Sequence, residues 1–301
     1  MTVVDAHAHL VVPGLGAEVS WRDGAQVVKF GGREIRSAVR EFVDLGRILE
    51  EQGRAGVDLV VLCPWVNLLG RETTRQNEAL AGMVGARVAA LGTVDLERPD
   101  ELRELMADGR LAGVEVAASV GGDYLGHERF RDFWAAAAET AALVFVHPTT
   151  RGFQLPVMDE HYLWNTVGNP LETTITSAHL VASGVLDEHP DLRILLAHGG
   201  GALPALRGRL AHEQTFHPPG RDVLGAIRRF HVDAVVHDVD VLRGLVDFFG
   251  PERVVCGSDY PFDMGVERPA DIVRALRLSD SEEAAILGGN ALRLLGQEIP
   301  A

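Results

Sequence analysis

The stretch "LVFVHPTT", residues 143–150, joins an unbroken apolar run to a histidine and then to a turn. Two other stretches contain an unbroken apolar run of the same kind, "DLVVLC" at residues 58–63 and "RILLAH" at residues 193–198. A strand covered on one face alternates apolar and polar residues, whereas a parallel strand covered on both faces is apolar throughout. These runs therefore predict a parallel sheet that is packed against helices.

Short apolar runs of this kind recur along the chain, with helix-like segments between them. We expect eight strands, near residues 3–9, 58–63, 88–94, 113–118, 143–148, 193–198, 231–236 and 254–258. Helical patterns occupy residues 100–109, 130–142, 178–188 and 239–249. This alternation over 301 residues predicts one α/β domain, residues 1–301, built as a distorted (β/α)8 TIM barrel. A doubly wound open sheet is the competing fold, but the glycine-rich turn that usually follows its first strand is missing from "DAHAHLVVPG".

Residues 11–40 interrupt the alternation directly after the first strand. Within them, "EVSWRDGAQVVKF" at residues 18–30 has the pattern of a small hairpin that turns at Asp23-Gly24. Loops and insertions at the carboxyl-terminal face of a barrel often carry or cover its active site. We therefore expect residues 11–40 to form a small insertion, or lid, near the active site.

Composition excludes several classes of function. The formal net charge of −15 argues against nucleic acid as a partner, because phosphate binding needs clustered cations. The longest apolar runs are too short for a transmembrane helix, and the first residues lack the pattern of a secretory signal. Cys63 and Cys256 both lie inside apolar strand-like runs, which favours reduced core thiols and a cytoplasmic location.

Five polar side chains follow these apolar runs at the ends of four separate strands. His7 and His9 end the first strand, His147 the fifth, His198 the sixth and Asp259 the eighth. Each residue alone could be an ordinary turn or capping residue. A barrel, however, brings the carboxyl ends of its strands together at one face, which is where barrel enzymes place their catalytic groups. The five residues are therefore our candidate active site.

The chemistry of this set indicates a metal. Three neutral imidazoles and one carboxylate suit a borderline divalent ion such as zinc, with manganese as the alternative. The remaining group, His198, could then act as a general acid or base beside the ion. His7 and His9 are two residues apart on a strand, so their side chains share a face.

The segments "DAHAHL", "VHP", "AHGGG" and "GSDYPF", in this order, resemble the amidohydrolase superfamily. Within it they are similar to the branch of aminocarboxymuconate-semialdehyde decarboxylase and related mononuclear decarboxylases without an organic cofactor. The resemblance extends to "ILGGNALRLLG" near the carboxyl terminus. It implies that His7, His9, His147 and Asp259 bind one metal ion and that His198 is catalytic. Binuclear members bridge two metals through a strand lysine, and the only lysine, Lys29, lies in the insertion.

The resemblance also implies residues for substrate binding. The decarboxylase holds its dianionic substrate with two arginines, which correspond to Arg36, chosen over Arg33 in "GGREIRSAV", and to Arg209. In that family the second arginine reaches the site of a neighbouring subunit, which implies a homodimer here. Trp164 resembles a family tryptophan, and Arg151 lies in the same substrate-contacting stretch.

These observations predict a metal-dependent decarboxylase of an unsaturated or aromatic carboxylic acid. His198 would either activate water for addition to the substrate or protonate the carbon that loses its carboxylate. The same set of groups also suits a hydrolase or hydratase of a lactone, amide or unsaturated acid, with His198 and Asp259 moving protons. A metal-storage or regulatory protein is the least favoured alternative, because the candidate ligands lie where barrels place catalytic groups.

Overall fold

The computed structural model describes residues 1–15, 17–22, 25–30, 33–37, 41–149, 155–216 and 221–297. Eight parallel strands within these residues form two sheets, in the orders β1-β5-β6 and β13-β12-β11-β10-β7. Their bounds are β1 (Val4–Leu10), β5 (Leu59–Pro64), β6 (Val88–Ala90), β7 (Gly113–Ala117), β10 (Leu143–His147), β11 (Arg193–Leu196), β12 (His231–Asp233) and β13 (Val254–Val255). All eight begin within one residue of the predicted start, whereas β6, β11, β12 and β13 end two to four residues before the predicted end.

The two sheets meet at both edges. Single parallel bridges join Gly92 to Val114 and Ala8 to Tyr260, so strand follows strand around a ring. A doubly wound sheet keeps two separate edges, whereas here β1 and the segment after β13 lie side by side. The fold is therefore the predicted barrel, distorted where the ladder is reduced to single bridges.

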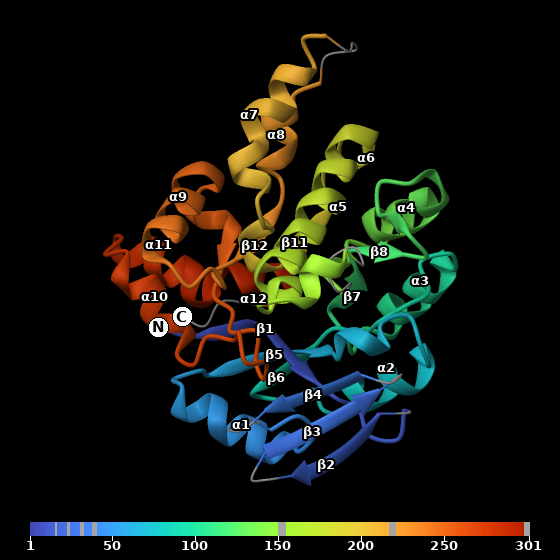
Figure 1. Ribbon diagram of the computed structural model, residues 1–301, viewed down its shortest axis with the longest axis vertical. Coiled ribbons are helices and arrows are strands. Elements are labelled where there is room, and N and C mark those ends of the chain that lie inside the picture. Colours follow the sequence, from blue (N-terminus) through green and yellow to red (C-terminus); the bar gives the residue numbers. More distant parts are fainter. Residues whose placement is uncertain are drawn as a thin grey trace.

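Helices follow the strands and cover the ring (Figure 1). They are α1 (Leu45–Arg54), α2 (Thr73–Ala81), α3 (Pro99–Asp108), α4 (Arg131–Thr140), α5 (Asn169–Ser183), α6 (Val185–Glu188), α7 (Leu203–Glu213), α8 (Val223–Ile227), α9 (Val239–Phe249), α10 (Pro269–Ala275), α11 (Asp280–Ala284) and α12 (Asn290–Leu294). Short 3-10 or π turns precede several of them, including η5 (Trp164–Gly168) and η6 (His198–Gly200). In Figure 1, α7 and α8 project from the rest of the molecule at one end.

Helix α5 begins earlier than the sequence predicted. The predicted helix, residues 178–188, is in fact the second half of α5 followed by α6, separated at Gly184 with φ +84°. The misassigned first half contains threonines, whose branched side chains disfavour helices. In α5 these hydroxyls bond back to the preceding turn, as from Thr174 to Pro170 O at 2.7 Å and from Ser177 to Thr173 O at 2.7 Å. Burial of this face compensates for the weak propensity.

The insertion after β1 forms a separate antiparallel sheet, β2 (Glu18–Arg22), β3 (Ala25–Phe30) and β4 (Arg33–Ser37). It has one strand more than the expected hairpin, whose predicted turn at residues 23–24 lies outside the described residues. The sheet is anchored, because Val28 is buried in the main core and Phe42 N donates to Gln26 Oε1 at 2.6 Å. A hydrogen bond from Val11 N to Phe42 O closes the base of the insertion.

A distinct apolar cluster fills the amino-terminal half of the barrel. Its residues come from β1, β5, β6, β10, β11 and β13 and from α12. Because side chains from six strands of the ring pack together, they occupy its interior, and the polar cluster described next lies above them. Strand β1 contributes its first residues to this apolar cluster and its last residues to the polar cluster. A register shift between Asp5 and Ala8 separates the two parts of the strand.

Candidate active site

The two histidines of β1 lie beside each other inside the barrel. His7 and His9 are almost completely buried, and their Nε2 atoms are 3.0 Å apart. The rings meet edge to face, with centroids 5.0 Å apart. The shared face that alternation along the strand predicted is therefore observed.

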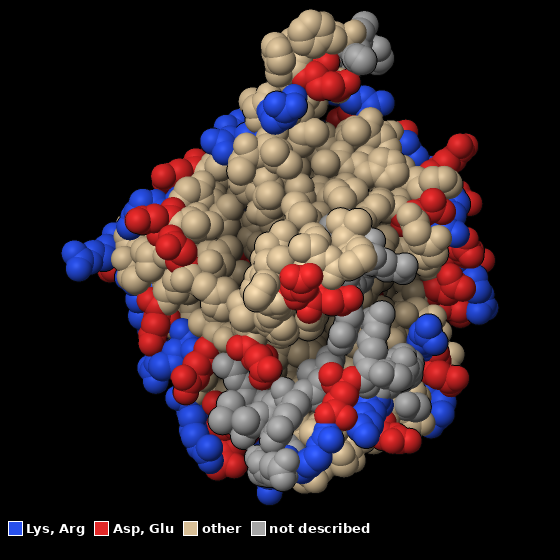
Figure 2. All heavy atoms as spheres, in the orientation of Figure 1, with Lys and Arg blue, Asp and Glu red and all other residues tan. Residues whose placement is uncertain are grey.

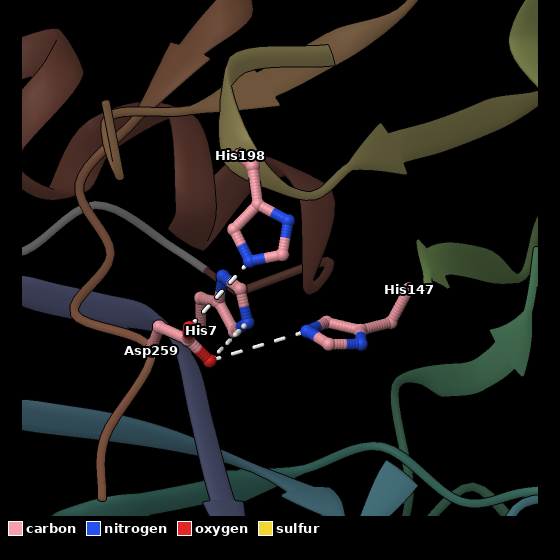
Figure 3. Close-up of side chains that lie close together, drawn as sticks. All are labelled: His7, His147, His198 and Asp259. Carbon is pink, nitrogen blue, oxygen red and sulfur yellow. Dashed lines mark ion pairs between the residues drawn. The ribbon is translucent and has the colours of Figure 1, made fainter. Parts of the chain in front are cut away.

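The other candidate residues converge on the same point (Figure 3). Asp259 Oδ1 lies 3.3 Å from His7 Nε2, 3.4 Å from His9 Nε2 and 4.0 Å from His147 Nε2. The fifth residue, His198, lies on the other side of the carboxylate, with its Nε2 3.5 Å from Oδ2. His198 Nε2 is nonetheless close enough to His7, His147 and Asp259 to belong to the same possible ligand group. The structure thus brings all five predicted residues together.

Each imidazole facing Asp259 Oδ1 has a hydrogen-bond acceptor behind it. His7 Nδ1 is 2.7 Å from Asp233 Oδ2, and His147 Nδ1 is 2.8 Å from Pro148 O. His9 Nδ1 is 3.2 Å from Pro64 O. Because these acceptors hold a proton on Nδ1, each Nε2 faces the centre of the cluster, where it can bind a proton or, when neutral, a metal ion. This is the tautomer that binds a metal through Nε2.

Asp233, which the sequence reasoning missed, is the most connected of these acceptors. Besides His7, it accepts hydrogen bonds from the backbone N–H groups of His198 at 3.0 Å, Gly199 at 3.0 Å and Val235 at 3.1 Å. It therefore fixes His7 and the turn that carries His198 at the same time. The available signal was a single acidic residue inside the run "HVDAVV", residues 231–236.

Asp5 performs the corresponding role between the first and last strands. Its Oδ1 accepts from His7 N at 3.1 Å and Ser258 N at 2.9 Å. Its Oδ2 accepts from Gln52 Nε2 at 2.9 Å and from Ser258 Oγ. A further bond runs from Asp259 N to His7 O at 2.8 Å. These contacts set the position of Asp259 relative to β1.

Glu115 on β7 is a second acidic residue that the sequence reasoning missed. It is fully buried, and its Oε1 lies 3.7 Å from His9 Nδ1. Neither carboxyl oxygen has a hydrogen-bond partner among the described residues, and burial holds the pKa of Glu115 well above its usual range. The signal was a charged residue inside the buried strand "GVEVA".

The imidazoles of the cluster differ in the direction in which their surroundings shift the pKa. Burial lowers the pKa of His9, and burial together with the neighbouring histidines holds that of His147 well below its usual range. Burial also opposes charge on His7, but Asp259 and the hydrogen bond to Asp233 outweigh it and raise the pKa of His7 to about 10. Despite its own burial, Asp259 has a pKa well below its usual range because His7, His198 and His9 lie close to its carboxylate. The cluster stabilises positive charge beside Asp259.

These residues fit a divalent metal ion. His147 Nε2 and Asp259 Oδ1 are buried and make no hydrogen bond within the described part of the chain. Such atoms are costly to bury without a partner, and a cation between them would satisfy both. Imidazole nitrogens with one carboxylate oxygen are a donor set for zinc and also accept manganese.

A cavity of about 230 Å³ opens beside His198 and Asp259. Part of its described lining is apolar, from Pro170, Val235, Val236, Val241 and Met264. The other side chains lining it include Asn165, Thr166, Asn169 and His237. This mixture of surfaces suits a small molecule with both apolar and hydrogen-bonding parts.

Two predicted substrate-binding residues with described side chains, Trp164 and Arg209, do not line this cavity. Trp164 lies in η5 and packs edge to face on Tyr162, with centroids 4.9 Å apart, and it is not among the described residues that line the cavity. Arg209 is exposed on α7, where it borders a different surface depression with Leu206 and His212. Arg151 lies outside the described residues, as do the side chains of Arg36 and its alternative Arg33, whose backbone forms part of β4.

No helix among the described residues combines the length and apolar character needed to cross a membrane. The fold and the cluster together place the chain among the (β/α)8 barrels that gather histidines and a carboxylate at the ends of their strands. The amidohydrolase family model matches residues 4–297. The chain therefore belongs to the amidohydrolase family.

Two curated relatives are decarboxylases. The chain is 28% identical over 271 residues to 2-amino-3-carboxymuconate-6-semialdehyde decarboxylase of Dictyostelium discoideum, which covers 82% of this chain and 75% of that protein. It is 33% identical over 212 residues to a 6-methylsalicylic acid decarboxylase of Aspergillus aculeatus, covering 64% of this chain and 59% of that protein.

Solved structures establish the same fold. The 5-carboxyvanillate decarboxylase of Novosphingobium aromaticivorans, crystallised with manganese and 4-hydroxy-3-methoxy-5-nitrobenzoic acid, has a TM-score of 0.82 at 19% identity, covering 98% of this chain and 96% of that one. A 2,6-dihydroxybenzoate decarboxylase in complex with 2,6-dihydroxybenzoate has a TM-score of 0.80 at 20% identity, covering 98% and 99%.

Proposed function

We propose that this protein is a metal-dependent decarboxylase that acts on an unsaturated or aromatic carboxylic acid without an organic cofactor. The observation that carries the proposal is the convergence of three Nε2 atoms on Asp259 Oδ1, with His198 on the opposite oxygen at the edge of a cavity. The decarboxylase relatives support the reaction type.

His7, His9, His147 and Asp259 would hold one divalent ion, zinc in our proposal, with manganese as the alternative. The manganese in a structural relative supports a divalent ion at such a site. When bound, the ion would polarise a substrate oxygen and orient the carboxylate that leaves.

His198 is the group that moves a proton. Its ring is 14% exposed and lines the cavity, so a substrate there can reach it. Asp259 Oδ2, 3.5 Å from Nε2, orients the ring. As the bond to the carboxyl carbon breaks and carbon dioxide leaves, the electron pair remains on the ring or alkene carbon, and a proton from His198 forms the new C–H bond.

Further parts of the proposal concern the substrate and assembly. Arg36, Arg151 and Trp164 would contact the substrate, and Arg209 would do so across a homodimer interface. Figure 2 shows a broad face with few charged side chains around α5 and the base of α7. Exposed apolar side chains on these segments, such as Ile175 on α5 and Leu206 on α7, support contact with a second copy.

We also propose that residues 11–40 cover the site. Phe42, at the end of this insertion, contacts Phe262 with ring centroids 6.4 Å apart, and Phe262 contacts His9 at 5.1 Å. The lid would thus lie over the ligand histidines. A cytoplasmic location is proposed as well, supported by Cys63 and Cys256, which are both buried and unpaired.

The test combines metal analysis with a substrate screen. Protein expressed with added zinc or manganese should contain about one divalent ion per chain by elemental analysis. It should release carbon dioxide from at least one of 6-methylsalicylate, 2,6-dihydroxybenzoate and 5-carboxyvanillate, followed by gas capture and absorbance. Substrate loss without carbon dioxide release would instead identify a hydrolase or hydratase, and two tightly held ions per chain would contradict the single-metal site.

A further inference from the structure

Three successive strands of the barrel are followed by a residue in the left-handed backbone conformation that lines the same cavity. These are His198 after β11, His237 after β12 and Asp259 after β13, with φ values of 55°, 56° and 56°. Residues other than glycine adopt this conformation rarely, and it costs on the order of 1 kcal/mol or more. Two of the three belong to the proposed catalytic cluster, and His237 has had no role so far.

The loop that carries His237 is fixed at both ends. On one side, Asp233 accepts a hydrogen bond from Val235 N at 3.1 Å. On the other, Asp238 caps α9 by accepting hydrogen bonds from Asp240 N and Val241 N, both at 2.9 Å. Because both flanking aspartates are tied to backbone groups, the backbone of His237 is held in place, and its exposed imidazole lies on the cavity wall. Such preorganisation is typical of residues that bind a ligand.

The surroundings of His237 indicate what it would bind. His198 and Asp259 occupy the end of the cavity at which the carboxylate would leave. Asn165, Thr166 and Asn169 also line the cavity and are neutral hydrogen-bonding groups, whereas Val235, Val236 and Met264 form an apolar surface. An imidazole on this wall can donate to or accept from an oxygen on the substrate's ring.

We propose that His237 determines substrate specificity by hydrogen bonding to a ring oxygen of the substrate other than the departing carboxylate. This inference rests on the proposed function for the identity of the reaction. It deepens that function by naming the substrate class, carboxylic acids with a ring hydroxyl on the side of β12. His237 would contribute mainly to binding, because His198 supplies the proton.

The test compares two ligands that differ by one hydroxyl. For His237→Ala we expect KM for 2,6-dihydroxybenzoate to rise about 5- to 30-fold, the usual effect of one lost hydrogen bond, with kcat changed less than threefold. For 2-hydroxybenzoate, KM should change less than twofold. His237→Asn, which keeps hydrogen-bonding capacity and tolerates the left-handed backbone, should recover part of the loss.

A control is available in His127, an exposed histidine outside the described lining of the cavity. His127→Ala should leave both substrates unaffected, and metal content should stay the same in all variants. Equal changes for the two substrates in His237→Ala, or none, would overturn the inference.

Binding of non-reacting analogues separates this inference from the proposed reaction. Calorimetry with 2-nitroresorcinol and 2-nitrophenol, whose nitro group replaces the carboxylate, should show the same selective loss in His237→Ala. Selective binding without decarboxylation of either acid would refute the proposed reaction and keep the role of His237. Failure of the wild-type protein to bind either analogue would overturn the inferred substrate class.

Discussion

Replacing Asp233 by Asn tests the proposed metal site through a residue that does not itself reach its centre. Asp233 Oδ2 accepts from His7 Nδ1 at 2.7 Å and His198 N at 3.0 Å, while Oδ1 accepts from Gly199 N and Val235 N. An amide has the same shape but only one oxygen. In either orientation its NH2 group therefore faces two N–H donors.

The magnitude follows from these four bonds. Each displaced donor that stays buried without an acceptor costs about 1–3 kcal/mol, so Asp233→Asn should lower the free energy of unfolding by about 2–6 kcal/mol. Where the NH2 group faces His7, Nδ1 must become an acceptor and the proton must move to Nε2. A protonated Nε2 cannot bind a metal, so we expect the metal dissociation constant to rise about 10- to 100-fold.

Competition against a chromophoric chelator measures this dissociation constant, and thermal unfolding with and without metal measures the stability. Asp240→Asn is the matched control, because Asp240 is an exposed aspartate on the adjoining helix α9. Metal affinity that is the same in Asp233→Asn and wild type would refute the argument that Asp233 fixes the tautomer of His7.

Three further predictions concern the roles of His198 and His147, the subunit interface at Arg209, and the pH dependence of stability. His198→Ala should keep its metal while turnover falls about 10²- to 10⁴-fold, whereas His147→Ala should lose metal and activity together; loss of metal in both would make His198 a ligand. Arg209→Ala mixed with His198→Ala should regain activity through hybrid dimers, and no regain despite verified subunit exchange would leave Arg209 a surface residue. Burial and the neighbouring Arg253 lower the pKa of His231 to about 3. Below pH 6.5 the unfolded state therefore binds the extra proton, and stability falls as pH falls toward 3, by about 2 kcal/mol between pH 6.5 and 5. Urea unfolding should show a smaller fall in His231→Gln, and an equal fall would contradict this assignment.

The position of the cluster could be predicted from sequence because each of its residues ends an apolar run. His147 and His198 lie at the ends of apolar runs, so the same segments indicate both the fold and the site. Glu115 and Asp233 were missed for the opposite reason. A single acidic residue inside such a run has no partner in its own segment, and its partners, His9 and His7, are more than 100 residues away.

The remaining differences also depend on tertiary contacts. The first half of α5 is helical because buried threonine and serine hydroxyls bond to the preceding turn, which local propensity does not report. Arg209 illustrates a different limit, since its neighbours on α7 place it at the surface and a partner subunit is needed to give it a role.

The contacts of Asp5 with Ser258 and of His7 with Asp259 join residues more than 250 positions apart. During synthesis, the ligand histidines of β1 emerge first, yet they lack their carboxylate until the last strand has been made and has docked. Capture of the proposed metal ion would therefore be a late event in the maturation of the chain, because the full set of ligands exists only once the ring has closed. Binding that is restricted to the closed state favours closure by mass action. The same ion that prepares the chemistry would thus also hold the first and last strands of the polypeptide together.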